Sequence, residues 1–151
     1  MHSWQKDVWH FHKASGLPAP DKLTMPPAKD LERRQKLIAE EATETCDALN
    51  KLICLEQEAQ RTAMDPDENS RLAVKRADLV REIVDGLVDT VVVVLGTAVE
   101  LGVDLDPAWA EVHASNMDKY PYHKNEWGKV IKPALWRAPR IPLVDQVRDE
   151  T

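Results

Sequence analysis

Apolar positions in the stretch from Arg81 to Gly102, REIVDGLVDTVVVVLGTAVELG, recur as pairs that step by three or four residues. By intrinsic propensity the run VVVVL favours a β-strand. The wider spacing, however, is that of a helix and not the strict alternation of a strand. Burial can offset the helix propensity that β-branched residues lose. The pattern therefore predicts one helix from about Leu72 to Leu101, ending at Gly102.

Two further helical patterns precede this one. Residues 3–14 predict a short amphipathic helix, and a proline-rich connector, SGLPAPDKLTMPPAKD, follows it. Residues 31–63 contain neither Pro nor Gly and predict a long helix with Asp30 as its N-cap. The apolar side of this long helix is expected to consist of Leu31, Ile38, Ala42, Leu49, Leu52 and Ile53.

After Gly102 the sequence predicts one more helix and then an irregular tail. Asp106 is expected to be the N-cap of that helix, with Pro107 at its first position. Beyond Pro121 the helical spacing is lost, except for a short final helix near Pro142 to Arg148. The expected fold class is all-α, a helical bundle of about four to five helices with an irregular C-terminal tail. It forms a single domain over 1–151, with an N-terminal helix and connector (1–30), a helical core (31–120) and a tail (121–151).

Composition narrows the function classes. The 151 residues, 43% hydrophobic and 30% charged, fit one soluble globular domain. The net charge of −6 argues against general nucleic-acid binding but is compatible with a nucleotide held through a divalent metal. The valine run is too short and too closely flanked by acids to span a membrane, and the N-terminal stretch MHSWQKDVWHFHK has no apolar core of signal-peptide length. Cys46 and Cys54 are about 12 Å apart along one helix, so they are expected to be reduced core residues of a cytoplasmic protein.

One acidic cluster lies within the helix that contains the valine run. Glu82, Asp85 and Asp89 fall within about 60° of one another around the helix axis. Their stripe continues to Val93 and Gly96, which indicates a face that becomes buried. The carboxylates are thus predicted at the rim of a core, facing a cleft, where they repel one another unless a cation joins them.

A second acidic cluster, AEEATE, lies on the long preceding helix and contains Glu40, Glu41 and Glu44. Like charges one turn apart destabilise a bare helix. If the two helices are antiparallel, the clusters can face each other, and their carboxylate oxygens suit Mg²⁺, with Mn²⁺ as an alternative. The competing interpretation is that both acidic runs are simply solvated helix faces.

Other metal and nucleotide sites fit the sequence less well. A di-iron site needs Glu-x-x-His, whereas His113 follows Glu111 by two positions. A zinc site needs a Cys/His cluster, and none occurs. The sequence also contains no P-loop, GxGxxG or GxSxG motif. His113 is expected to have a structural role.

Four segments in order, RRQKLIAEEATE, EIVDGLVDTVVVVLGTAVELGVDLD, EVHASNMDK and GKVIKPALW, resemble the MazG-like all-α nucleoside triphosphate pyrophosphohydrolases. Within these the chain is similar to the branch of phosphoribosyl-ATP pyrophosphohydrolase and the dimeric dUTPases, over roughly Trp9 to Trp136. The resemblance implies hydrolysis of a nucleoside triphosphate to the monophosphate and pyrophosphate with Mg²⁺ or Mn²⁺, in nucleotide-pool house-cleaning. It also implies a homodimer or a higher homo-oligomer. Substrates to weigh are dUTP, dCTP and phosphoribosyl-ATP, the last being less expected because that activity belongs to a histidine pathway and usually to a shorter chain.

The resemblance also implies metal ligands. Glu40, Glu41 and Glu44 match the family's EExxE motif, and Glu41 or Glu40 is expected to act as the general base. Glu82 and Asp85 match ExxD literally. A second register places Asp89 at the motif's aspartate and Gly86 at its glutamate, with Asp85 as the substitute. Both registers stay open, and the predicted metal ligands are Glu40, Glu41, Glu44, Glu82, Asp85 and Asp89.

Substrate-binding residues are expected near the end of the chain. Asn116 and Lys119 lie about one helical turn apart, in reach of the base or the phosphates. Lys129 and Lys132 are candidates for phosphate contacts, and Trp127 or Trp136 for stacking on a base. The plainer alternative is that the tryptophans anchor the tail. The functional rival to an enzyme is a catalytically weak nucleotide-binding or structural helical homodimer.

Overall fold

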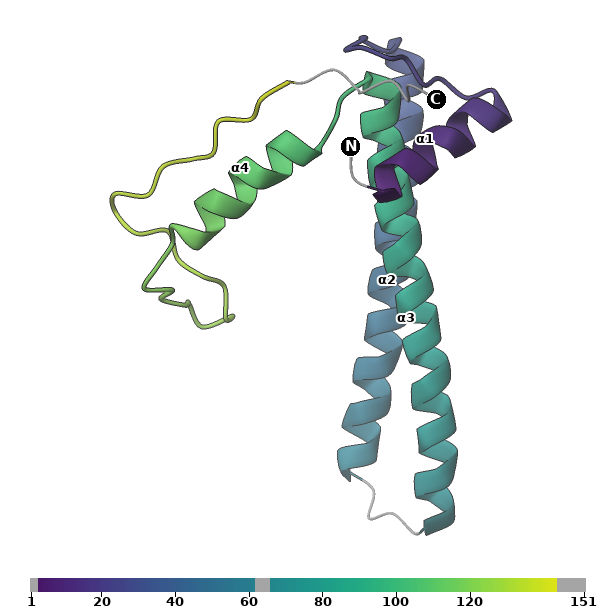
Figure 1. The fold of residues 1–151 in the computed structure, drawn as a ribbon. Helices are drawn as coiled ribbons and strands as arrows, with labels where there is room; N and C mark the ends of the chain where they lie inside the picture. The colour runs from purple at the N-terminus through teal and green to yellow at the C-terminus, as the bar shows by residue number, and fades with distance from the viewer. Residues whose placement is uncertain (1–2, 62–65, 144–151) are drawn as a thin grey trace. The chain divides into compact units, whose positions relative to one another are not determined.

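The structure is a computed structural model that describes residues 3–61 and 66–143 (Figure 1). These residues form four helices, α1 (Ser3–Ser15), α2 (Ala28–Arg61), α3 (Pro66–Leu101) and α4 (Asp106–Met117), and an isolated bridge between Lys124 and Val130. The predicted all-α fold is confirmed, and so is the helical state of the valine run. Most of the predicted helix near Pro142 to Arg148 lies outside the described residues.

The chain divides into two compact units, one of residues 26–97 and one of residues 1–25 with 98–151. The first unit contains α2 and most of α3, which run side by side as a helical hairpin (Figure 1). No helix within the described residues is both long enough and apolar enough to cross a membrane.

The hairpin is held by small residues at the helix contact. Thr45 and Ala48 of α2 are buried, and Gly86 of α3 lies against Thr45. A Cβ atom added at Gly86 would be 2.7 Å from Thr45 Oγ1. The hydroxyl oxygens of Thr45 and Thr90 are 3.3 Å apart across the same contact. The helices therefore approach each other closely because no large side chain separates them.

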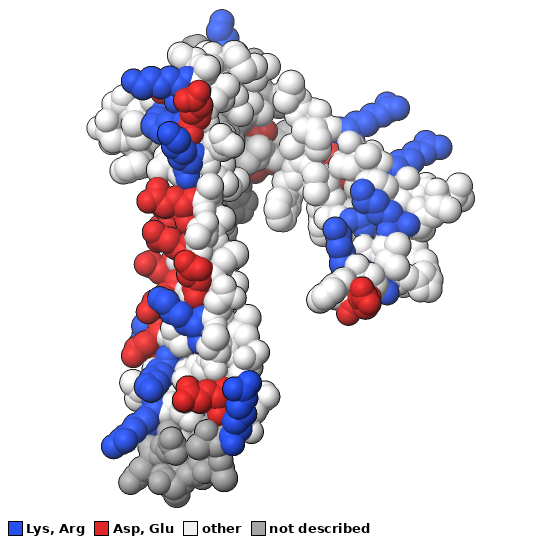
Figure 2. Space-filling model, turned by 180° about the vertical axis from the view of Figure 1, so that it is seen from behind, with Lys and Arg blue, Asp and Glu red and all other residues white. Residues whose placement is uncertain are grey.

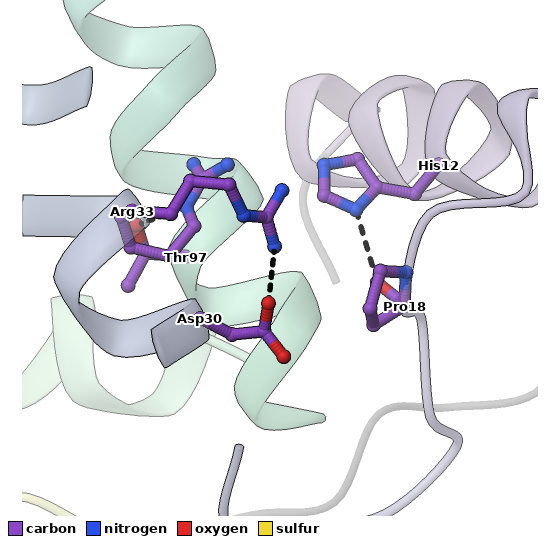
Figure 3. Close-up of polar contacts among 6 residues, drawn as sticks. His12, Pro18, Asp30, Arg33 and Thr97 are labelled. Carbon is purple, nitrogen blue, oxygen red and sulfur yellow. Dashed lines mark hydrogen bonds and ion pairs between the residues drawn. The ribbon is translucent and has the colours of Figure 1, made fainter. Parts of the chain in front are cut away.

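A buried arginine joins the same two helices near the other end of the hairpin. Arg34 Nε donates to Thr97 Oγ1 at 3.1 Å, and its guanidinium also donates to the carbonyl of Val93. Thr97 Oγ1 in turn donates to the Val93 carbonyl at 2.9 Å. In the neighbouring Arg33, Nη2 instead lies 3.4 Å from Oδ1 of Asp30, within α2 (Figure 3). Arg34 thus joins α2 to α3 by donating to two acceptors on α3, the Thr97 hydroxyl and the Val93 carbonyl.

The starts of the two long helices differ from the prediction. Helix α2 begins at Ala28, so Asp30 lies in its first turn and is not the N-cap. The carbonyl of Pro27 accepts the N–H groups of Asp30 and Leu31 and so begins the helix earlier. Helix α3 begins at Pro66, not near Leu72, because proline is compatible with the first turn of a helix.

The predicted apolar side of α2 is only partly buried. Leu31, Leu49 and Ile53 are exposed, and the expectation that Cys46 and Cys54 are core residues is wrong, since both are free and exposed. The reason is that a pair of helices buries only one narrow seam, in which Thr45, Ala48, Leu72 and Ile83 are buried. The apolar side chains of α3 that remain exposed are Val74, Val80, Val84, Leu87, Val88, Val91, Val92 and Val94.

In the second unit, Gln5 fixes α1 to the segment that follows α3. Its buried side chain donates to the Val103 carbonyl at 2.6 Å and accepts the N–H of Leu105 at 3.1 Å. The connector after α1 is ordered in turn by His12, whose Nδ1 lies 3.0 Å from the carbonyl oxygen of Pro18 (Figure 3).

Helix α3 ends where the sequence predicts, at Gly102. This glycine has a φ of +67°, and an added Cβ would be 2.1 Å from the Lys22 carbonyl oxygen, so both conformation and space require glycine. The next helix is correctly placed, but Asp106 is its first residue and not its N-cap. The N-cap residue is Leu105, which makes no side-chain cap hydrogen bond, while the buried Asp104 accepts the N–H of Asp106 at 3.0 Å just before the helix.

Candidate functional site

The hairpin of α2 and α3 carries a column of Asp and Glu side chains with an uncharged band beside it (Figure 2). Glu41 of α2 is half-buried. Partial burial raises its pKa first, and the charges of Asp89, Glu44, Glu40 and Asp85 raise it further, in that order. The structure therefore brings together carboxylates from both predicted clusters around Glu41.

Glu82 has a different neighbour. Its Oε2 lies 2.7 Å from Lys51 Nζ, and this hydrogen bond raises the pKa of Lys51. Glu82 is not among the charges that raise the pKa of Glu41. The structure thus groups Asp85 and Asp89 with Glu41 and pairs Glu82 with Lys51. Sequence reasoning missed Lys51, because a contact between two helices has no signature in spacing along either one.

The acidic stripe of α3 leads toward the interior, as its pattern predicts. Asp85 and Asp89 are exposed, Val93 is half-buried, and Gly96 is buried. Glu41 lies on the facing helix, where burial is already enough to affect its pKa. The carboxylates are therefore at the boundary between solvent and the packed part of the hairpin.

The donor set fits a hard divalent cation. Carboxylate oxygens are the ligands that Mg²⁺ prefers, and after burial the nearby carboxylates raise the pKa of Glu41 further. As the described side chains stand, no three His, Cys, Asp or Glu residues are close enough to enclose a metal ion. Glu40, Glu44, Asp85 and Asp89 are exposed and can turn toward a cation.

The raised pKa of Glu41 predicts how stability depends on pH without metal. The folded state holds this proton more tightly than the unfolded state, so stability falls as pH rises from the ordinary glutamate range through the raised pKa. Glu41→Gln removes that cost. We expect the metal-free variant to melt above wild type at pH 7, and the difference to shrink as pH falls below the ordinary glutamate range. Thermal melting followed by circular dichroism measures both; a variant that melts at or below wild type at pH 7 would contradict the prediction.

Four of the predicted substrate-binding residues meet where α4 ends and the tail returns. Lys119 Nζ donates to Asn116 Oδ1 at 2.6 Å. Lys132 Nζ lies 4.3 Å from the centre of the Trp136 ring, and Lys119 Nζ lies 5.6 Å from it. Lysine and tryptophan in these positions make cation–π contacts. The segment therefore presents two ammonium groups beside one aromatic ring.

A residue that sequence reasoning did not single out holds this arrangement. Ser115, buried in α4, accepts the Trp136 Nε1 proton at its carbonyl at 2.9 Å, and its hydroxyl donates to the Arg137 carbonyl at 3.2 Å. The two contacts join the motif EVHASNMDK to the end of the motif GKVIKPALW and to the residue that follows it. Ser115 could have been found from its place in the first motif, but its partner lies about twenty residues away. The anchoring role considered for the tryptophans is thus observed for Trp136.

Lys129 and Trp127 lie in a separate turn of the tail. The Asn125 side chain accepts the N–H groups of Trp127 at 3.1 Å and Lys129 at 2.9 Å. Gly128 completes the turn with a φ of +76°. The side chains of Trp127 and Lys129 are exposed, Trp127 by 84%. Trp127 is therefore not an anchor of the tail, and Lys129 stays a predicted phosphate ligand.

Comparison with known protein families identifies the relatives of this chain. A family model described as phosphoribosyl-ATP pyrophosphohydrolase matches residues 8–116, which is more than half of the 151 residues. The match includes both acidic clusters and Asn116, and it ends before Lys119. No curated protein matches the chain. On the family match, the chain belongs to the phosphoribosyl-ATP pyrophosphohydrolase family of the MazG-like all-α superfamily, which implies pyrophosphohydrolase activity on a nucleotide-like substrate.

Proposed function

We propose that this protein hydrolyses a nucleoside or deoxynucleoside triphosphate to the monophosphate and pyrophosphate with Mg²⁺, with dUTP as the first substrate to test. Its role would be the removal of unwanted nucleotides from the cytoplasmic pool. The observation that carries the proposal is the position of Glu41 among Glu40, Glu44, Asp85 and Asp89. Membership of a pyrophosphohydrolase family supports the same reaction class.

The chemistry follows from what these side chains can do. Glu40, Glu44, Asp85 and Asp89 would hold the metal, with Glu41 as a further ligand or as the base. Mg²⁺ held by these residues would neutralise charge on the phosphate oxygens and acidify a water molecule. Glu41 would accept a proton from the attacking water. The new P–O bond comes from water, the anhydride bond between the α and β phosphates breaks, and pyrophosphate leaves.

The lysine cluster supplies charge of the opposite sign. Lys119 and Lys132 would bind phosphate oxygens, and Lys129 would add a third cation from its turn. Asn116 positions Lys119 through the hydrogen bond between their side chains.

Phosphorus NMR of the purified protein with Mg²⁺ and a panel of triphosphates, dUTP included, tests the proposal. Equal amounts of monophosphate and pyrophosphate, abolished by EDTA, are the expected products. Diphosphate with free phosphate would mean that a different anhydride bond is cleaved. An intact panel would favour the rival reading, a nucleotide-binding or structural protein.

We also propose that the protein is a homodimer at least. Val80, Val84, Leu87, Val88 and Val91 follow one face of α3 at helical spacing, and each is more than a third exposed. A second copy that covers this face would remove a large apolar area from water. Light scattering should give at least twice the chain mass of 17.1 kDa, and Val88→Glu should lower it. The mass of a single chain for wild type would contradict the proposal.

A further inference from the structure

The ring of Trp136 contacts three residues, Ser115, Lys119 and Lys132. Its edge is fixed, because Nε1 donates to the Ser115 carbonyl at 2.9 Å. Its π surface is contacted by Lys132 Nζ at 4.3 Å and by Lys119 Nζ at 5.6 Å from the ring centre. A nucleobase that stacked on a face contacted by one of these ammonium groups would have to displace it.

We propose that Trp136 is a positioning residue that holds Lys119 and Lys132 together for the phosphate chain of the substrate, and that it does not stack on the base. The inference rests on the proposed function, since it takes a triphosphate as the ligand. It changes the role expected for Trp136 from base recognition to phosphate recognition.

The physical reason lies in the cost of placing two like charges together. Two ammonium groups repel each other, and their long side chains lose rotamer freedom when a ligand fixes them. The negative face of an indole ring attracts both groups and so offsets the repulsion. Asn116 restricts Lys119 further through the 2.6 Å hydrogen bond. A polyphosphate, with oxygens on successive phosphorus atoms, can then bind a pair of cations that is already assembled.

The same placement predicts that base identity does not affect the contribution of Trp136. Ser115 holds the ring at its edge, and the two lysines reach it from different segments, the turn after α4 and the tail. A ligand that has phosphates but no base should therefore depend on Trp136 as strongly as a nucleotide does.

Titration calorimetry with inorganic tripolyphosphate and with dUTP, both with Mg²⁺, tests this on the full chain, using Glu41→Gln as the common background to prevent turnover. We expect Trp136→Leu to weaken both ligands by about 5- to 30-fold, the sum of two exposed cation–π contacts. Trp136→Phe keeps an aromatic face and should lose less. Trp109→Leu, on the exposed surface of α4, is the matched control and should bind like the background protein.

A second measurement separates positioning from a general loss of structure. In a Lys119→Met, Lys132→Met background, Trp136→Phe should cause no further loss of tripolyphosphate affinity, because the groups it positions are gone. A further loss of the same size would overturn the inference. So would a Trp136→Leu protein that binds dUTP weakly but tripolyphosphate normally, since that pattern identifies base stacking.

The two proposals fail in different ways. If the background protein does not bind tripolyphosphate, the positioning role is overturned, whatever the wild-type protein hydrolyses. If tripolyphosphate binds and depends on Trp136, but phosphorus NMR shows no hydrolysis of any triphosphate by wild type, the proposed reaction fails and the phosphate site stands.

Discussion

Glu41→Gln is expected to lower the turnover of the triphosphate substrate by about 100-fold or more, the loss typical of removing a general base. The substitution keeps the size of the side chain and removes its ability to accept a proton. Glu41 is the natural choice for this test because burial and four neighbouring carboxylates already raise its pKa. Pyrophosphate release under saturating Mg²⁺ and nucleotide measures the effect as kcat.

The control for this prediction is Glu32→Gln, an exposed glutamate on the same helix, which should retain wild-type turnover. Circular dichroism should show the same helix content for both variants, so that a loss of activity is not a loss of fold. Full turnover by Glu41→Gln would exclude Glu41 as the base and would transfer that role to Glu40, the other predicted candidate. If the protein is not an enzyme, no turnover will be measured for wild type, and the Glu41→Gln and Glu32→Gln variants will not differ from each other.

Gly86→Val is expected to destabilise the protein by about 3 kcal/mol, the upper range for overpacking a tight contact. Even the first added carbon would be 2.7 Å from Thr45 Oγ1 and 3.3 Å from Thr45 Cα. The hydroxyl cannot simply turn away at no cost, because it donates to the Glu41 carbonyl at 2.8 Å. For a chain of this length the melting temperature should fall by roughly 10 °C.

Ala77→Val, at an exposed position of α3, is the matched control and should change stability by about 0.5 kcal/mol or less. Gly86→Ala gives a finer test, because alanine gains helix propensity while its methyl group meets Thr45. In a Thr45→Ala background the obstructing oxygen is gone, so Gly86→Ala should become less destabilising or stabilising. If Gly86→Val has the same melting temperature as wild type, the two helices are not in the close contact that the structure shows.

These contacts also connect stability to the site. Glu41 is one turn before Thr45, and Asp85 and Asp89 lie on either side of Gly86 along α3. The small pair Thr45 and Gly86 therefore sets the spacing at which the carboxylates of the two helices meet. We expect that a bulky residue at Gly86 also lowers metal affinity in any molecules that remain folded.

The sequence by itself determined the helices and the acidic clusters, because both depend on local geometry. A period of 3.6 residues identified the valine run as helix despite its strand propensity, and the glycine stop at Gly102 was placed correctly for the same reason. The spacing of Glu40, Glu41 and Glu44 put them on one helix. The starts of α2 and α3 were less predictable. Both helices begin at or just after a proline, several residues before the apolar residues from which the helices were predicted.

Only the tertiary structure decided which charges meet and which apolar faces are buried. Spacing could not separate Glu82 from Asp85 and Asp89, because the difference is made by Lys51 on the opposite helix. Nor could it show that Leu49 and Ile53 stay exposed, since the seam buries Thr45 and Ala48 of α2 instead. The meeting of Lys119, Lys132 and Trp136 depends on an irregular tail fixed by Ser115, and irregular backbone has no period from which its neighbours can be predicted.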